Sequence, residues 1–264
     1  MRLPSEIVKM YSMLGATKAD QPILKTFILA IFAGGFIALG ALGSQVVSCA
    51  VEPLAFGRAL SGLIFPVGLV MVIIAGGELF TGNCLLVLPT LDHQISWRDF
   101  IKNLAIVYAG NLVGSLFIAA LVNFGHVLSF QDGVLARSVI ATASAKATIP
   151  FVDGLLKGIG CNILVCIAVW AGFAAEELSG RIIALYLPIF LFVVCGFEHC
   201  VANMYFIPAG LLAEYIYGMD SESLNILGMV KNLIPVTLGN LIGGSVCVGM
   251  GYHFAYTYGI YEDD

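Results

Sequence analysis

Two polar clusters interrupt long apolar stretches of this chain. One lies in residues 77–83 and contains the hydroxyl of Thr81, and the other lies in residues 197–203 and contains the imidazole of His199. An ionisable ring deep in an apolar segment is costly to insert into a membrane, so its default interpretation is functional. A hydroxyl and an imidazole could together bind a small anion or give it a proton. The structural alternative is a neutral histidine bonded to a carbonyl group or to Asn203.

The two clusters are related by a repeat. At an offset of 120 positions, Glu78 matches Glu198 and Asn83 matches Asn203. A Lys-Asn-Leu and Gly-Asn-Leu pattern that begins at Lys102 reappears at Lys231, 129 positions later. The chain is therefore predicted to consist of two homologous halves.

The composition indicates a membrane protein. Hydrophobic residues make up 59% of the chain and charged residues 11%, and the mean hydropathy is +0.97. Several uncharged stretches approach or exceed the ~20 residues that cross a bilayer as a helix. The net charge of −5 is spread over loops and termini without a basic stripe, so no nucleic-acid partner is expected.

Six apolar segments are expected to cross the bilayer, at about 23–51, 59–91, 103–123, 158–175, 182–213 and 232–252. The second would extend about 50 Å as one straight helix, which is longer than the hydrocarbon is thick. It is therefore predicted to break at its polar cluster, and the fifth likewise. Three crossings per half is an odd number, so the halves must be inverted relative to each other. The fold class is thus an all-α membrane protein of two inverted three-helix repeats.

We expect a single membrane domain over residues 1–264. Its parts are an amphipathic surface helix (1–21, with Leu3, Ile7, Met10 and Leu14 on one face), a first repeat (22–125), a connecting region (126–151), a second repeat (152–257) and a tail (258–264). Lysine and arginine are slightly more numerous on the side of the N-terminus, which favours both termini in the cytoplasm.

Other polar residues suit structural roles or exclude other functions. Glu78 and Glu198 are interpreted as caps of exposed backbone amides, because a carboxylate in an anion path would repel its cargo. The asparagines are expected to bond between helices, namely Asn83, Asn203, Asn111, Asn240 and Asn162. The seven cysteines form no CxxC pair, so no metal and no cofactor is predicted. An enzyme would need more than Thr81 with His199, since no oxyanion stabiliser is identified.

The sequence closely resembles the formate/nitrite transporter family over nearly its whole length. The matching motifs are residues 78–81, 161–166, 168–170, 196–199, 202–203, 232–237 and 239–240. The resemblance implies a homopentamer of six-span protomers with an aquaporin-like inverted repeat. Each protomer would have its own pore for small monovalent anions of weak acids, such as formate, nitrite, lactate or hydrosulfide.

The resemblance also implies roles for individual residues. His199 is similar to the central histidine of the family, Thr81 to the hydroxyl that faces it, and Asn162 to a polar neighbour in the pore. Two apolar constrictions around the histidine would be formed by Phe65, Leu69, Leu79, Phe80 and Phe192, which periodicity alone would assign to core packing. Lys146, seven positions before Asp153, resembles the vestibule lysine, and Lys25 resembles its counterpart at the other mouth.

The cargo is open at this point. Gly82 and Asn83 directly follow the threonine, unlike in the common formate channels, and the chain is most similar to the hydrosulfide-channel branch. We predict transport of a small weak-acid anion across the cell membrane, assisted by protonation or hydrogen bonding at His199. The alternative is a water or neutral-solute channel, which the deep histidine and the cationic mouths disfavour. A structural scaffold would not explain two polar breaks at equivalent depths.

Overall fold

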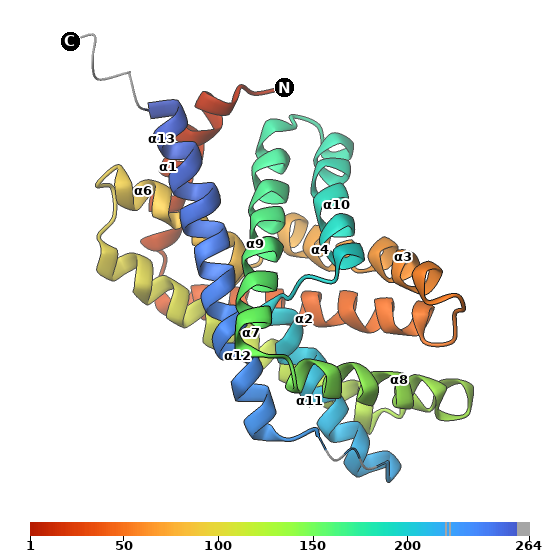
Figure 1. The fold of residues 1–264 in the computed structure, drawn as a ribbon. Coiled ribbons are helices and arrows are strands. Elements are labelled where there is room, and N and C mark those ends of the chain that lie inside the picture. The colour runs from red at the N-terminus through yellow and green to blue at the C-terminus, as the bar shows by residue number, and fades with distance from the viewer. Residues whose placement is uncertain (220, 222, 258–264) are drawn as a thin grey trace, which may run out of the picture.

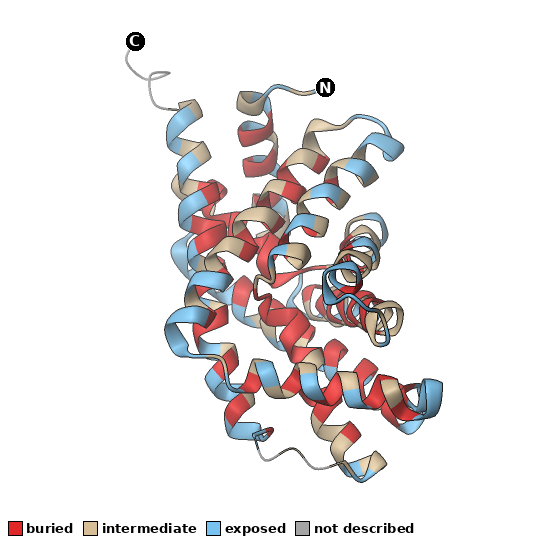
Figure 2. Ribbon diagram, turned by 45° about the vertical axis from the view of Figure 1, so that its right-hand side comes forward, coloured by how far each residue is buried: buried red, intermediate tan, exposed pale blue. Residues whose placement is uncertain are grey.

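The computed structural model describes residues 1–219, 221 and 223–257, and in this part of the chain every regular element is helical. Six helical segments are long and apolar enough to cross a membrane, at Ile23–Ser48, Leu54–Ala75, Trp97–Phe124, Phe151–Ala174, Leu178–Cys195 and Ile226–Thr257. They pack into one bundle around a common centre (Figure 1). Buried residues concentrate in the middle of the bundle, and exposed residues cover its outer faces (Figure 2).

The second and fifth segments are broken, as the sequence predicts. The second consists of α3 (Leu54–Ile64) and α4 (Pro66–Ala75), a non-helical stretch, and then α5 (Phe80–Asn83), η1 (Cys84–Leu86) and α6 (Val87–Leu91). The fifth consists of α10 (Leu178–Cys195), a non-helical stretch, and α11 (Cys200–Tyr217). The elements are those of two inverted repeats, so the expected fold class is confirmed.

The two breaks have the same backbone geometry. Each begins at a glycine with positive φ, 82° at Gly76 and 71° at Gly196, a conformation that favours glycine because it has no Cβ. Each ends at an extended residue, Leu79 (φ −113°, ψ 127°) or His199 (φ −113°, ψ 117°). The helix restarts inside the polar cluster of the first half, where Thr81 lies in the first turn of α5.

Four unbroken elements surround the breaks. They are α2 (Ile23–Ser48), α7 (Trp97–Phe124), α9 (Phe151–Ala174) and α12 (Ile226–Leu241), the last of which continues as the π-helical η3 (Ile242–Met250) and α13 (Gly251–Thr257). Glycines let α2 approach α7 and α9 approach α12. A Cβ on Gly34 would lie 2.1 Å from the carbonyl oxygen of Asn111, and one on Gly239 would lie 2.2 Å from that of Leu155.

Two further helices, α1 (Pro4–Ala19) and α8 (Phe130–Ala147), lie at opposite ends of the bundle (Figure 1). The helix α8 occupies most of the expected connecting region. The N-terminal helix also differs from the expectation, because Ile7, Val8 and Tyr11 form its buried face while Leu3 and Leu14 are exposed. It packs on α6 and α13, so contacts with the protein select its buried face. Lys18 and Lys146 are the next-to-last residues of these two helices, 128 positions apart.

Candidate functional site

Three cavities follow one another through the bundle. The α1-side cavity has a volume of about 320 Å³, and its lining includes Lys18, Glu78 and Leu79. The α8-side cavity has about 140 Å³, and its lining includes Lys146 and Glu198. A central cavity of about 10 Å³ lies between them. That volume holds about one water molecule, so the passage is too narrow for a hydrated ion in this conformation.

Apolar side chains form both walls of the central cavity, and His199 is the polar residue in its lining. Leu69 and Leu79 line the central and the α1-side cavities, whereas Phe65 and Phe192 line the central and the α8-side cavities. Four residues expected at constrictions therefore lie on either side of the imidazole. The fifth, Phe80, packs on Tyr108 with ring centroids 5.1 Å apart and does not line any of these three cavities.

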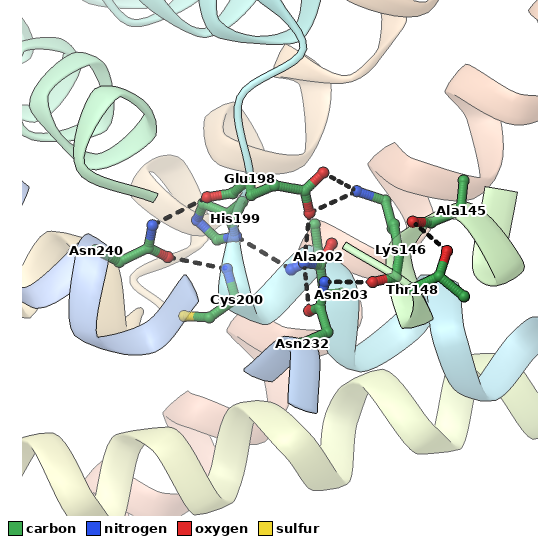
Figure 3. Close-up of polar contacts among 10 residues, drawn as sticks. All are labelled: Ala145, Lys146, Thr148, Glu198, His199, Cys200, Ala202, Asn203, Asn232 and Asn240. Atoms are coloured by element: carbon green, nitrogen blue, oxygen red, sulfur yellow. Dashed lines mark hydrogen bonds and ion pairs between the residues drawn. The ribbon is translucent and has the colours of Figure 1, made fainter. Parts of the chain in front are cut away.

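Both ring nitrogens of His199 are occupied by hydrogen bonds. Nδ1 accepts from the backbone N–H of Ala202 at 3.0 Å, which caps α11 (Figure 3). Nε2 lies 3.0 Å from the hydroxyl oxygen of Thr81. Because Nδ1 is an acceptor, the neutral ring carries its proton on Nε2 and donates it to the Thr81 oxygen. The imidazole is thus a fixed donor whose proton is directed at the opposite break.

Thr81 is positioned by Asn162. The Asn162 side-chain nitrogen donates to the carbonyl oxygen of Thr81 at 3.2 Å and to that of Asn240 at 2.6 Å. Asn162 is fully buried and does not line the three cavities, so the structure places this expected pore neighbour one layer behind the passage. Its hydrogen bond fixes the position of Thr81, and the Thr81 hydroxyl in turn sets the direction in which His199 donates.

Two equivalent asparagines satisfy the backbone of the breaks. Asn111 accepts from the N–H of Phe80 at 2.9 Å and donates to the carbonyl oxygens of Ala30 at 2.7 Å and Glu78 at 2.9 Å. Its counterpart Asn240 accepts from the N–H of Cys200 at 2.9 Å and donates to the carbonyl oxygens of Gly158 at 2.8 Å and Glu198 at 3.0 Å. An amide side chain suits this task because a break exposes both donors and acceptors, and an amide can bond to both.

The carboxylates of the breaks bind side chains, so the expectation that they cap backbone amides is wrong. Glu198 Oε2 accepts from Asn203 Nδ2 at 2.7 Å, and both carboxylate oxygens lie 2.9 Å from Lys146 Nζ (Figure 3). Asn203 also donates to Asn232 Oδ1 at 2.8 Å. The backbone amides are already bonded to the asparagines, and each carboxylate therefore serves as the counter-ion of a lysine.

The first half repeats this network. Glu78 Oε2 accepts from Asn83 Nδ2 at 2.7 Å and from Lys18 Nζ at 3.2 Å, and Asn83 also donates to Asn103 at 2.9 Å. Lys18, and not Lys25, is thus the counterpart of Lys146 in this structure. Lys25 is exposed on the first turn of α2 and has no side-chain bond to any described residue. The sequence offers one signal that favours Lys18 over Lys25 as this counterpart, namely that Lys18 is 128 positions before Lys146.

We expect Asn240→Leu to destabilise the protein strongly. The change leaves one buried N–H and two buried carbonyl groups without their partner, and each unsatisfied group costs about 1–3 kcal/mol. Thermal unfolding in detergent, followed by tryptophan fluorescence, should show a markedly lower midpoint, and Asn111→Leu should behave alike. Asn225→Leu is the matched control, because that asparagine caps the end of α12 through a single bond to Gly228. Equal losses in all three variants would contradict the special role of the two break asparagines.

Comparison with known proteins shows the family to which the chain belongs. The model of the formate/nitrite transporter family matches residues 5–254. The formate channel FocA of Haemophilus influenzae is 36% identical over 247 residues, which cover 88% of this chain and 87% of that protein. The uncharacterized transporter YrhG of Bacillus subtilis is 39% identical, with 97% of this chain and 94% of that protein covered.

Solved structures show the same relationship. An FNT family ion channel superposes with a TM-score of 0.86 at 30% identity and covers 95% of this chain and 98% of its own. A pentameric formate channel with formate bound has a TM-score of 0.79 at 35% identity, with 89% and 98% covered. An aquaglyceroporin from Plasmodium falciparum, at 12% identity and a TM-score of 0.50, shares the fold alone, with 86% and 96% covered. This chain is a multi-pass membrane protein that belongs to the formate/nitrite transporter family.

Proposed function

We propose that the protein conducts small monovalent anions of weak acids, such as formate, nitrite or hydrosulfide, across the cell membrane. The observation that carries the proposal is the placement of one hydrogen-bond donor, His199, between two apolar constrictions. The resemblance to a pentameric formate channel supports a homopentamer with one passage in each protomer. The lysine and arginine bias of the loops supports both termini in the cytoplasm.

The apolar constrictions favour a neutral cargo. Moving an unpaired charge into an apolar site costs far more than moving a small neutral molecule there. A weak acid lowers this barrier by taking up a proton in the wider cavities, crossing as the neutral acid and releasing the proton on the other side. A strong-acid anion of similar size does not have this route. We therefore expect the cargo's own acidity to decide which anions pass.

His199 assists as a hydrogen-bond donor and not as the permanent source of the proton. A neutral ring that gave away its Nε2 proton would become an imidazolate, which is not accessible near neutral pH. Taking up a second proton would require Nδ1 to lose its bond from Ala202 N–H. The Nε2–H group, directed by Thr81, can instead bond to an oxygen or sulfur of the passing cargo while the constriction strips its water. Protons then travel with the cargo.

The test is uptake into liposomes that contain the purified protein. Formate, nitrite and hydrosulfide are compared with chloride across a pH series, with and without a proton gradient, and osmotic water flow is measured on the same vesicles. We expect weak-acid uptake to rise as the pH falls toward the pKa of each acid and chloride uptake to stay near background. Rapid water flow with no anion uptake would replace this proposal by a water channel. Equal uptake of chloride and formate would remove the neutral-cargo step.

A further inference from the structure

The two lysines at the mouths are not free charges. Lys146 contacts both oxygens of Glu198 at 2.9 Å, and Lys18 contacts Glu78 at 3.2 Å. Each pair is formally neutral, so its field falls off much faster with distance than that of a single charge. Attraction of an anion to the mouth therefore needs another cation. Two basic side chains at the cavities have no acidic partner among the described residues.

One such residue lies at the α1 side. Arg181, in the first turn of α10, lines the α1-side cavity together with Lys18 and Glu78. Its Nε donates to the carbonyl oxygen of Gly172 at 3.0 Å, which fixes the guanidinium in place. Its two terminal nitrogens have no hydrogen bond or ion pair to any described residue. The charged side chains of this cavity are thus two cations and one carboxylate, with a net charge of +1.

The second residue lies at the α8 side. Arg58, in α3, lines a surface groove of about 710 Å³ that shares Ser61 and Val193 with the α8-side cavity. One terminal nitrogen, Nη1, would lie 3.8 Å from a Cβ placed on Gly196, and that glycine itself lines the α8-side cavity. The side chain of Arg58 is exposed and makes no hydrogen bond or ion pair with a described residue. It stands where the groove meets the cavity.

The two arginines occupy related places in the repeat. The helices α3 and α10 are equivalent, and Ser61 is the residue 120 positions before Arg181. Arg58 is three positions before Ser61, which is close to one turn of the same helix. Each half of the protein thus has an arginine on the equivalent helix, α3 or α10. Neither arginine has an acidic partner among the described residues, and one lies at each mouth. The positions of the two arginines do not follow from the Glu–Asn–Lys hydrogen bonds at the breaks, because neither arginine bonds to those residues.

We propose that Arg58 and Arg181 are the residues that attract the anion to the two mouths, and that the lysine–glutamate pairs hold the breaks together. The inference rests on the proposed function. An unpaired guanidinium at a narrow entrance raises the local concentration of anions, and it binds carboxylate-like cargo through its planar N–H donors. Because the two arginines lie at opposite mouths, each should act on anions that arrive from its own side.

The experiment measures half-saturation from each side separately. Proteoliposomes are sorted by orientation through sided cleavage of an N-terminal tag, and formate uptake is recorded at about 10 mM and about 500 mM salt, where the Debye length falls from ~30 Å to ~4 Å. Arg181→Gln is expected to raise the half-saturation concentration several-fold for anions that enter from the α1 side and to leave the other side unchanged. Arg58→Gln should give the mirror result. Both effects should largely disappear at high salt.

Matched controls separate this idea from general charge loss and from damage to the fold. Arg98→Gln, at an exposed position in the first turn of α7, and Arg137→Gln, at an exposed position on α8, each remove one positive charge without changing the lining of the three cavities. Both should leave the half-saturation values unchanged. Arg181→Lys keeps the charge and should restore most of the affinity.

Three outcomes would overturn the inference. The first is an unchanged half-saturation in both arginine variants, and the second is an equal effect from both sides. The third is a raised half-saturation concentration that persists at high salt and is accompanied by a lower melting temperature. That result would mean that Arg181 only caps the end of α9. Wild-type vesicles that carry no weak-acid anion at all would instead refute the proposed function, and the two failures are distinguishable in the same data set.

Discussion

Replacing His199 by leucine is expected to reduce weak-acid uptake by roughly tenfold to a hundredfold. The variant removes the donor that faces the neutral cargo in the narrowest part of the passage, and a polar group left there without its hydrogen-bond partner costs about 1–3 kcal/mol. Leucine fits the local backbone, because Leu79 has nearly the same φ and ψ at the equivalent position of the other half. The loss should therefore come from chemistry and not from strain.

His199→Asn provides the matched comparison. Its side-chain oxygen can still accept from Ala202 N–H, and its shorter amide keeps an N–H donor at this position, although not at the place of Nε2. We expect this variant to retain a larger share of the uptake than the leucine variant, with a similar dependence on pH. Stopped-flow uptake at several pH values measures both quantities. If the leucine and asparagine variants lose the same fraction of uptake, the donor role of the imidazole is wrong.

Lys146→Glu is expected to be the most damaging single change at either mouth. The ammonium group contacts both oxygens of Glu198, and the two side chains are only 16% and 10% exposed. Breaking a buried pair leaves an uncompensated charge at a cost of about 3–5 kcal/mol, and a second carboxylate adds repulsion. The folded yield in detergent and the melting temperature should both fall sharply. Lys18→Glu should cost less, because Lys18 is 34% exposed.

A double variant distinguishes support of the break from attraction of the cargo. Lys146→Met with Glu198→Gln removes both charges and keeps an oxygen that can accept from Asn203. We expect the melting temperature of this variant to recover most of what Lys146→Met alone loses, since a neutral replacement of a buried pair is often tolerated. Its half-saturation for formate should stay near the wild-type value. A large rise in half-saturation, with normal stability, would show that the lysine attracts the cargo.

Much of the fold could be predicted from the sequence because its signals are local or repeated. The excess length of the second and fifth apolar segments and the polar cluster in each predicted two breaks, and both are present. The matching offsets predicted two homologous halves. In the structure, Asn111 in the first half and Asn240 in the second make the same pattern of hydrogen bonds. The unpredicted helix α8 shows the limit of hydropathy, which does not detect a helix of mixed polarity.

Other features depended on contacts between distant parts of the chain. Sequence alone predicted where the two long segments break, because the length of a segment and its polar residues are properties of that segment by itself. Which partner each polar group binds was decided only by tertiary packing. It placed Lys18 instead of Lys25 beside Glu78, turned Phe80 toward Tyr108 and brought Thr81 to within 3.0 Å of His199. The physical reason is that a hydrogen bond or an ion pair depends on distance in space, and residues on different helices come into contact only in the assembled bundle.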